Sequence, residues 1–156
     1  MIYNNQKPLP TEELSPLIAE LTKQGTDVTL TVTGNSMKPM LTHLRDSVLL
    51  TKCNPDKLKV GDITLYKREN GRYILHRILK VHEDTFDFAG DHQIELETGI
   101  KKSQVLCVVK GFTHKGKFHS CKELKYRLYA LVWRVLFPFR GCIMRLYRKL
   151  HSIFRK

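Results

Sequence analysis

Residues 62–81, DITLYKRENGRYILHRILKV, are the stretch of the chain from which the fold is most directly predicted. Runs rich in isoleucine, leucine and tyrosine lie on both sides of Asn70-Gly71, as expected for two strands joined by a turn. An Asn-Gly pair favours tight hairpin turns, because both residues tolerate positive φ. The stretch therefore predicts a β-hairpin, and an isolated hairpin needs further strands to be stable.

Those further strands are predicted on both sides of the hairpin. Residues 28–33 alternate valine or leucine with threonine, and a second hairpin turn is expected at Lys115-Gly116. The remaining predicted strands cover residues 46–52, 84–90 and 103–119. From residue 27 to residue 119 the sequence thus predicts a mainly β domain of short strands with Gly-rich turns, curled or barrel-like.

Helical patterns flank this domain. Residues 11–24 place leucine and isoleucine on one helix face, and Gly25 follows as a stop signal. After residue 120 the apolar period becomes helical again, in two series separated by Pro138. The first series consists of Leu128, Leu131, Val132, Val135 and Leu136, and the second runs from Phe139 to Leu150. Three segments are expected: an N-terminal extension with a short helix (1–26), a β-rich domain (27–119) and a basic amphipathic helical tail (120–156).

The positive charge is concentrated in the tail. The chain of 156 residues has a formal net charge of +12, and residues 120–156 hold ten basic residues against the single acidic Glu123. A basic segment of this kind favours an anionic partner. Arginines interrupt the apolar runs before they reach the length of a membrane span.

Four interpretations of the tail remain open. Aromatic and apolar residues beside Lys and Arg are typical of a helix lying in the plane of an anionic membrane, which is the leading expectation. The alternatives are packing of the helices on the β domain, a helix for a partner protein, and nucleic-acid binding, although no reader motif for nucleic acid is present. The N-terminus shows neither a signal peptide nor an anchor, so peripheral association on the cytoplasmic side, or a cytoplasmic location, is expected.

Cysteine and histidine positions suggest no cofactor. Cys53, Cys107, Cys121 and Cys142 form no C-x-x-C pair, and His114 and His119 near Cys121 match no common metal spacing. We expect free thiols, no metal and no cofactor.

One serine stands in a context that differs from an ordinary loop. Ser36 lies in TVTGNSMKPML (31–41), directly after a predicted strand, with the pattern G-x-S-M-x-P. Taken alone, a serine after a strand is a turn residue. His76, forty residues later within the predicted hairpin, supplies a base for a nucleophilic serine.

The order of several short motifs resembles the type I signal peptidase family, in its endoplasmic-reticulum and archaeal-like branch. These motifs are GNSMKP (34–39), RDSVLL (45–50), VGDITLY (60–66), YILHRIL (73–79), FAGDHQIELETG (88–99) and VLCVVKG (105–111). The self-cleaving domains of SOS-type repressors share the first motif but use lysine as the base, and here His76 precedes Arg77. The resemblance covers about residues 28–112 and implies the curled β fold of a signal-peptidase catalytic domain.

The resemblance also implies roles for individual residues. Ser36 would be the nucleophile, His76 the general base and Asp91 the carboxylate that orients the imidazole. Glu95 and Glu97 stand where that family has aspartates, so the third member is left open between Asp91, Glu95, Glu97 and none, the last giving a Ser-His dyad. The turn Gly34, Asn35 and Ser36 would form the oxyanion site, with the Ser36 N–H as donor and no hydroxyl at position 34.

Two functions follow from the sequence. The leading hypothesis is a signal-peptidase-like serine endopeptidase that cleaves a leader peptide, a signal peptide or a membrane-proximal protein. The competing hypothesis is an inactive module of the same fold that binds membrane or nucleic acid through its basic tail.

Overall fold

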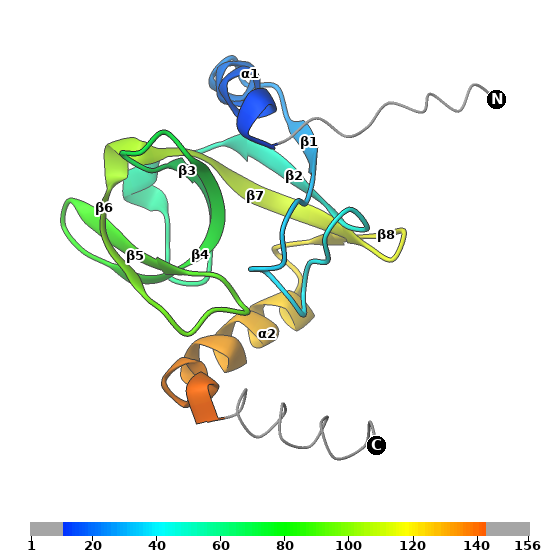
Figure 1. Ribbon diagram of the computed structural model, residues 1–156. Helices are drawn as coiled ribbons and strands as arrows, with labels where there is room; N and C mark the ends of the chain where they lie inside the picture. Colours follow the sequence, from blue (N-terminus) through cyan, green and yellow to red (C-terminus); the bar gives the residue numbers. More distant parts are fainter. Residues whose placement is uncertain (1–10, 143–156) are drawn as a thin grey trace.

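The computed structural model of the protein describes residues 11–142, in which one antiparallel sheet of eight strands carries the fold (Figure 1). The strands follow the order β1-β2-β7-β3-β4-β5-β6, and β8 pairs with β7. They are β1 (Val28–Thr31), β2 (Ser47–Lys52), β3 (Ile63–Lys67), β4 (Tyr73–Val81), β5 (Thr85–Ala89), β6 (Glu97–Lys101), β7 (Val105–His114) and β8 (Lys117–Ser120). The mainly β prediction is confirmed, but the sheet is not closed into a barrel, since β1 and β6 form its two ends within the described residues.

The predicted hairpin is present as β3 and β4. The register places Thr64 opposite His76 and Tyr66 opposite Ile74. Gly71 has φ +85° in the connection between the strands, as the Asn-Gly signal predicts. The connection spans residues 68–72 and is therefore longer than the tightest hairpin turn.

Two α-helices and three short 3-10 turns complete the described chain. Helix α1 (Thr11–Lys23) and helix α2 (Leu124–Val135) lie at opposite ends of the molecule (Figure 1). The 3-10 turns are η1 (Pro55–Lys57), η2 (Lys102–Gln104) and η3 (Phe137–Phe139). Pro138 lies within η3, and most of the second predicted helical series falls outside the described residues.

Apolar side chains on the two faces of the sheet form two clusters. Ile63 and Leu65 of β3 belong to the larger cluster, together with Leu41 and Val48. Tyr66, on the other face of β3, joins a smaller cluster with Phe86, Phe88 and Ile78. Alternation along the strand thus divides β3 between two cores.

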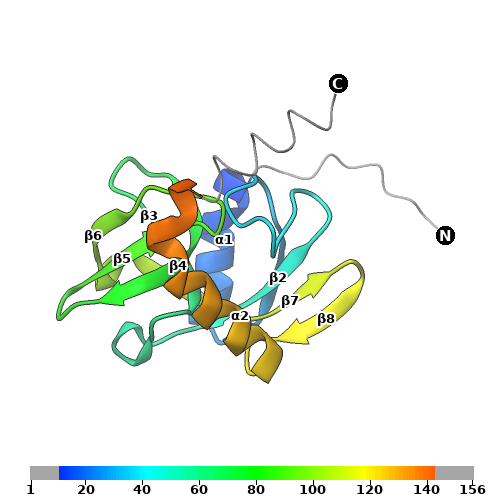
Figure 2. The same cartoon turned by 90° about the horizontal axis from the view of Figure 1, so that it is seen from below.

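Helix α2 packs on the domain through the face that the sequence pattern did not favour. Tyr126 and Ala130 are buried, whereas Leu128, Leu131 and Val135 of the predicted apolar face are exposed. Figure 2 shows α2 lying across the outside of the molecule, beginning near the β7–β8 hairpin. Packing on the β domain, one of the four open interpretations of the tail, therefore holds for α2.

A buried ion pair joins the sheet to α2 and to the loop after β5. Arg77 of β4 binds both carboxylate oxygens of Asp91, with Nε–Oδ1 and Nη2–Oδ2 distances of 2.8 Å, and both side chains are fully buried. Arg77 also donates to the carbonyl of Gly61 and to the hydroxyl of Tyr126 on α2. Tyr129 donates to the same carboxylate.

Replacing one member of this pair should strongly destabilise the fold. Because the remaining charge would be buried without its partner, we expect Arg77→Met or Asp91→Asn to lower the free energy of unfolding by about 3–5 kcal/mol. Urea denaturation followed by tryptophan fluorescence measures the change.

The double variant is the internal control for this prediction. Arg77→Met with Asp91→Asn should lose less stability than the two single losses added together, because neither charge remains unpaired. Asp27→Asn, which breaks the exposed Asp27–Lys110 pair, serves as a surface comparison and should change stability little. Strictly additive losses would contradict the assignment of this ion pair.

Candidate active site

Ser36 lies in the loop that connects β1 to β2. Within this loop Gly34 has φ +94°, a conformation that side chains with a Cβ rarely adopt, and its N–H donates to His43 Nδ1 at 2.8 Å. The N–H of Leu41 donates to the carbonyl of Met37 at 2.9 Å. Met37 and Leu41 are buried in the larger core cluster, so the part of the loop that follows Ser36 is anchored to the core.

The loop after β5 supports Ser36 from a second direction. The N–H of His92 donates to the Ser36 carbonyl at 2.7 Å. A Cβ added to Gly90 would lie 2.5 Å from the same carbonyl oxygen, so the close approach of the two loops requires glycine at position 90. The FAGDH motif of the sequence is thus in direct contact with the GNSM motif.

His76 lies on β4, and its side chain is only 3% exposed. Its Nδ1 is 3.3 Å from the hydroxyl oxygen of Tyr66, and that hydroxyl donates its single proton to Glu97 Oε2 at 2.8 Å. The Tyr66 oxygen can therefore only accept from His76, which places the imidazole proton on Nδ1. The lone pair of Nε2 is then available to take up a proton.

Glu97 at the start of β6 is held in its ionised form. Burial raises the pKa of Glu97, but hydrogen bonds from Arg68 and Tyr66 outweigh this effect and bring the pKa below its usual value. Arg68 Nε lies 2.6 Å from Glu97 Oε1. A carboxylate, a phenol and an imidazole are thus connected in the order Glu97, Tyr66, His76.

Burial sets the protonation state of His76. Removal from water lowers the pKa of His76 from 6.5 to about 4, and the positive charge of Arg68 acts in the same direction. The charges of Glu97 and Asp91 raise it only in part. His76 is therefore neutral at neutral pH, which is the state that a general base requires.

The sequence had led us to expect that Asp91 binds His76. In the structure its hydrogen bonds go to other residues. Its two carboxylate oxygens accept from Arg77 and Tyr129. Glu95 is exposed, and of the three acidic residues weighed it is Glu97 that reaches His76, through Tyr66. Arg77, the residue that follows His76 in the sequence, binds the Asp91 carboxylate on the other face of β4.

Ser36 and His76 line the same pocket, which has a volume of about 450 Å³. The end of β1 with the residues that follow it forms one wall, and Tyr73 to His76 of β4 form another. β1 pairs only with β2, and residues 73–76 pair only with β3, so both walls present an unpaired strand edge among the described residues. No hydrogen bond joins the Ser36 and His76 side chains in this part of the chain.

Of the three residues predicted for the oxyanion site, two use a backbone group in a hydrogen bond within the loop. The Gly34 N–H is used by His43, and the Asn35 carbonyl accepts from the Lys38 N–H at 3.2 Å. Within residues 11–142 the Ser36 N–H donates to no other group.

Three residues of the site were not predicted from the sequence. The hairpin register brings residues 63–67 beside 73–77, with Arg68 directly after them, so the Asn-Gly turn could have indicated Tyr66. Gln93 also lines the pocket, and its Oε1 accepts from the Gly90 N–H at 3.1 Å. Its position depends on the loop after β5, for which the sequence carries no local signal.

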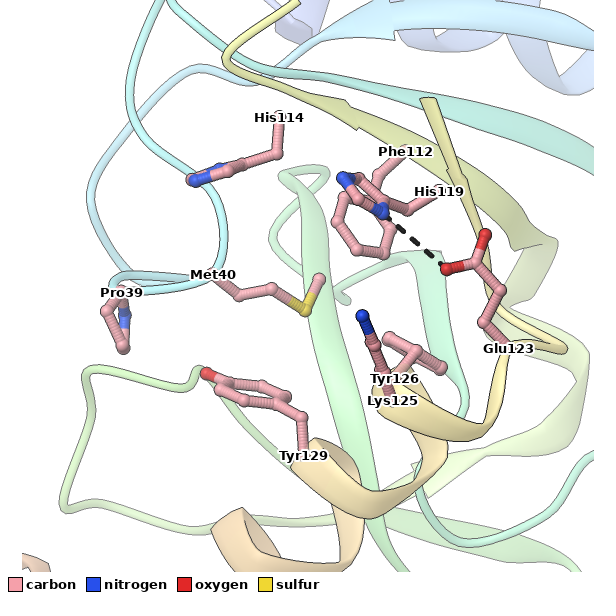
Figure 3. Close-up of a pocket in the computed structure, with 9 residues that line it drawn as sticks. All are labelled: Pro39, Met40, Phe112, His114, His119, Glu123, Lys125, Tyr126 and Tyr129. Atoms are coloured by element: carbon pink, nitrogen blue, oxygen red, sulfur yellow. Dashed lines mark ion pairs between the residues drawn. The ribbon is translucent and has the colours of Figure 1, made fainter. Parts of the chain in front are cut away.

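A second pocket, of about 370 Å³, is lined by Pro39 and Met40 of the Ser36 loop (Figure 3). Met40 and Pro39 of that loop form one wall, and residues of β7, β8 and the start of α2 form the others. His119 and Glu123 are paired at 3.5 Å at its edge. Its lining holds no serine, threonine or cysteine.

The four cysteines are free, and among residues 11–142 no group of three or more His, Cys, Asp or Glu side chains is arranged to hold a metal ion. No protein-family model and no curated protein sequence matches the chain.

The neutral state of His76 predicts how stability depends on pH. Between pH 6.5 and about 4 the unfolded chain takes up a proton at residue 76 that the folded protein does not bind, so the free energy of unfolding falls as the pH falls. Between about pH 7 and about pH 5 the loss from His76 should reach about 2 kcal/mol.

Urea denaturation of the wild type and of His76→Gln across this pH range isolates that contribution. The wild type should lose more stability than the variant on acidification, while His82→Gln, at an exposed histidine, should follow the wild type. Parallel curves for the wild type and His76→Gln would show that His76 titrates normally.

Proposed function

We propose that the protein is a serine endopeptidase of the signal-peptidase type, with Ser36 as nucleophile and His76 as general base. The observation that carries this proposal is that Ser36 and a buried, neutral histidine line one pocket. The mainly β fold is compatible with the signal-peptidase catalytic fold that the sequence motifs resemble, and we extend the proposal to that fold.

The reaction would begin with proton transfer from the Ser36 hydroxyl to His76 Nε2. The serine oxygen then attacks the carbonyl carbon of the scissile bond, and the Ser36 N–H stabilises the resulting oxyanion. The side-chain amide of Gln93 is the candidate for a second donor, since its oxygen is already bound to Gly90. His76 returns the proton to the leaving amine, and water, activated by the same histidine, hydrolyses the acyl-enzyme.

The residues behind His76 would keep it in the reactive tautomer. Tyr66 accepts from Nδ1–H, and the Glu97 carboxylate favours the imidazolium that forms during the reaction. In this proposal Tyr66 and Glu97 are positioning residues and Asp91 is part of the scaffold.

An extended peptide is the substrate that the pocket fits best. The unpaired edges of β1 and of Tyr73–His76 offer backbone donors and acceptors to a strand that enters between them. A leader peptide, a signal peptide or a membrane-proximal segment satisfies this requirement, and the resemblance implies small residues near the cleavage point.

A fluorophosphonate probe tests the nucleophile directly. The wild type should be labelled at Ser36, and Ser36→Ala should abolish labelling, because only a serine activated by a base reacts with the probe. His76→Ala should lower the labelling rate by at least roughly 10³-fold, in the range seen when a protease loses its base.

Ser103→Ala and His82→Ala are the matched controls, and both should be labelled like the wild type. If the folded wild type is never labelled and cleaves no peptide, the protein is the inactive module of the competing hypothesis. If the Ser36→Ala variant is still labelled, the reactive residue is not Ser36.

Tyr66→Phe and Glu97→Gln test the positioning of His76. We expect each variant to lower the labelling rate by roughly 10- to 100-fold, since part of the contribution of a general base is lost when its orientation is lost. Glu97→Gln should also move the acid limb of the pH–rate profile to lower pH, because the Glu97 charge raises the pKa of His76.

Tyr73→Phe provides the control for Tyr66→Phe, since it removes a hydroxyl from the same pocket. It should leave the rate unchanged. An unchanged rate in both Tyr66→Phe and Glu97→Gln would reduce the mechanism to a Ser-His dyad.

A further inference from the structure

The outward face of α2 and η3 carries an uninterrupted apolar surface. Its exposed side chains are Leu124, Leu128, Leu131, Val132, Val135 and Phe139, with exposed fractions from 45% to 80%. Leu124, Leu128, Leu131 and Val135 recur at the spacing i, i+4, i+7 and i+11, which aligns them along one side of the helix. The opposite side is already packed on the domain through Tyr126 and Ala130.

Basic residues border this surface on both sides. On a helix of 3.6 residues per turn, Arg127 and Arg134 flank the leucines on one side and Lys125 on the other. All three are exposed. The acidic Glu123 lies just before the helix, so the face itself combines apolar and cationic side chains without a carboxylate.

A groove of about 870 Å³ runs beside the helix on the arginine side. Leu124, Leu128 and Leu131 line it together with four basic residues, Lys59, Lys122, Arg127 and Arg134. Its one carboxylate, Asp62, accepts a hydrogen bond from the Lys59 N–H at 2.8 Å. The groove can therefore take anionic groups immediately next to an apolar ridge.

We propose that this face docks in the plane of an anionic phospholipid membrane, with the leucine ridge at the level of the acyl chains and the basic groove on the head groups. A lipid surface offers phosphate groups for the basic residues and, beneath them, hydrocarbon for the leucine side chains. Within residues 11–142 no helix is long and apolar enough to cross a membrane. The docking does not depend on whether Ser36 is reactive.

Flotation of the full-length protein with vesicles tests the docking. The protein should float with vesicles in which about a third of the lipid is phosphatidylglycerol and far less with phosphatidylcholine alone, and added salt should weaken the interaction. Leu128→Glu with Leu131→Glu should reduce binding by at least roughly 100-fold, since both side chains lose their burial in lipid. Arg127→Gln with Arg134→Gln should reduce it by about 30-fold.

Matched variants change the same charges elsewhere on the surface. Val81→Glu with Phe118→Glu, at exposed apolar residues of the sheet, and Lys57→Gln with Lys80→Gln should float almost as the wild type does. Phosphonate labelling of every variant should be unchanged, which separates this test from that of the proposed function.

Two results would overturn the proposal. One is a wild type that floats with neither kind of vesicle, including the case in which the leucines instead mediate self-association detected by sedimentation. The other is flotation that persists in the Leu128→Glu, Leu131→Glu variant, because binding would then come from another part of the chain.

Discussion

The buried pair of Arg77 and Asp91 is the interaction on which the arrangement of the site depends. Two opposite charges without access to water are stable together only when further hydrogen bonds satisfy them. Those bonds come from Gly61 before β3, from Tyr126 and Tyr129 of α2, and from the thioether of Met40 in the Ser36 loop. The guanidinium on β4 and the carboxylate after β5 thus hold three further segments at the same point.

His76 and Arg77 are neighbours in sequence that serve opposite faces of β4. Because successive side chains of a strand point to opposite sides, Arg77 faces α2 while His76 faces Tyr66. Because Arg77 fixes the position of β4, it also fixes the backbone position of His76 without contacting the imidazole. This explains how Asp91, which matches an active-site motif, can support the site and still leave the imidazole to Tyr66 and Glu97.

Local patterns in the sequence predicted the hairpin, most of the strands and the mainly β class, since alternation and turn residues act over a few positions. The partner of Asp91 could not be predicted this way, because it depends on which loop meets β4 in three dimensions. Strand β6 was missed because it is short and contains Gly99, which has φ +73°, and glycine is depleted in strands. The roles proposed for Ser36 and His76 came from the order of the motifs, and the structure places both residues in one pocket.

The orientation of α2 follows from the polar surface it covers. The loop after β5 presents the backbone carbonyls of Asp91 and Gly90, which leucine side chains would leave without donors. The indole N–H of Trp133 donates to Asp91 at 2.8 Å, and Arg140 donates to Gly90 at 2.9 Å. Aromatic side chains of α2, together with Arg140 after it, therefore face inward, and the leucines remain outside. Because the same loop contacts Ser36, the inner face of α2 supports the candidate active site while its outer face stays available to a partner.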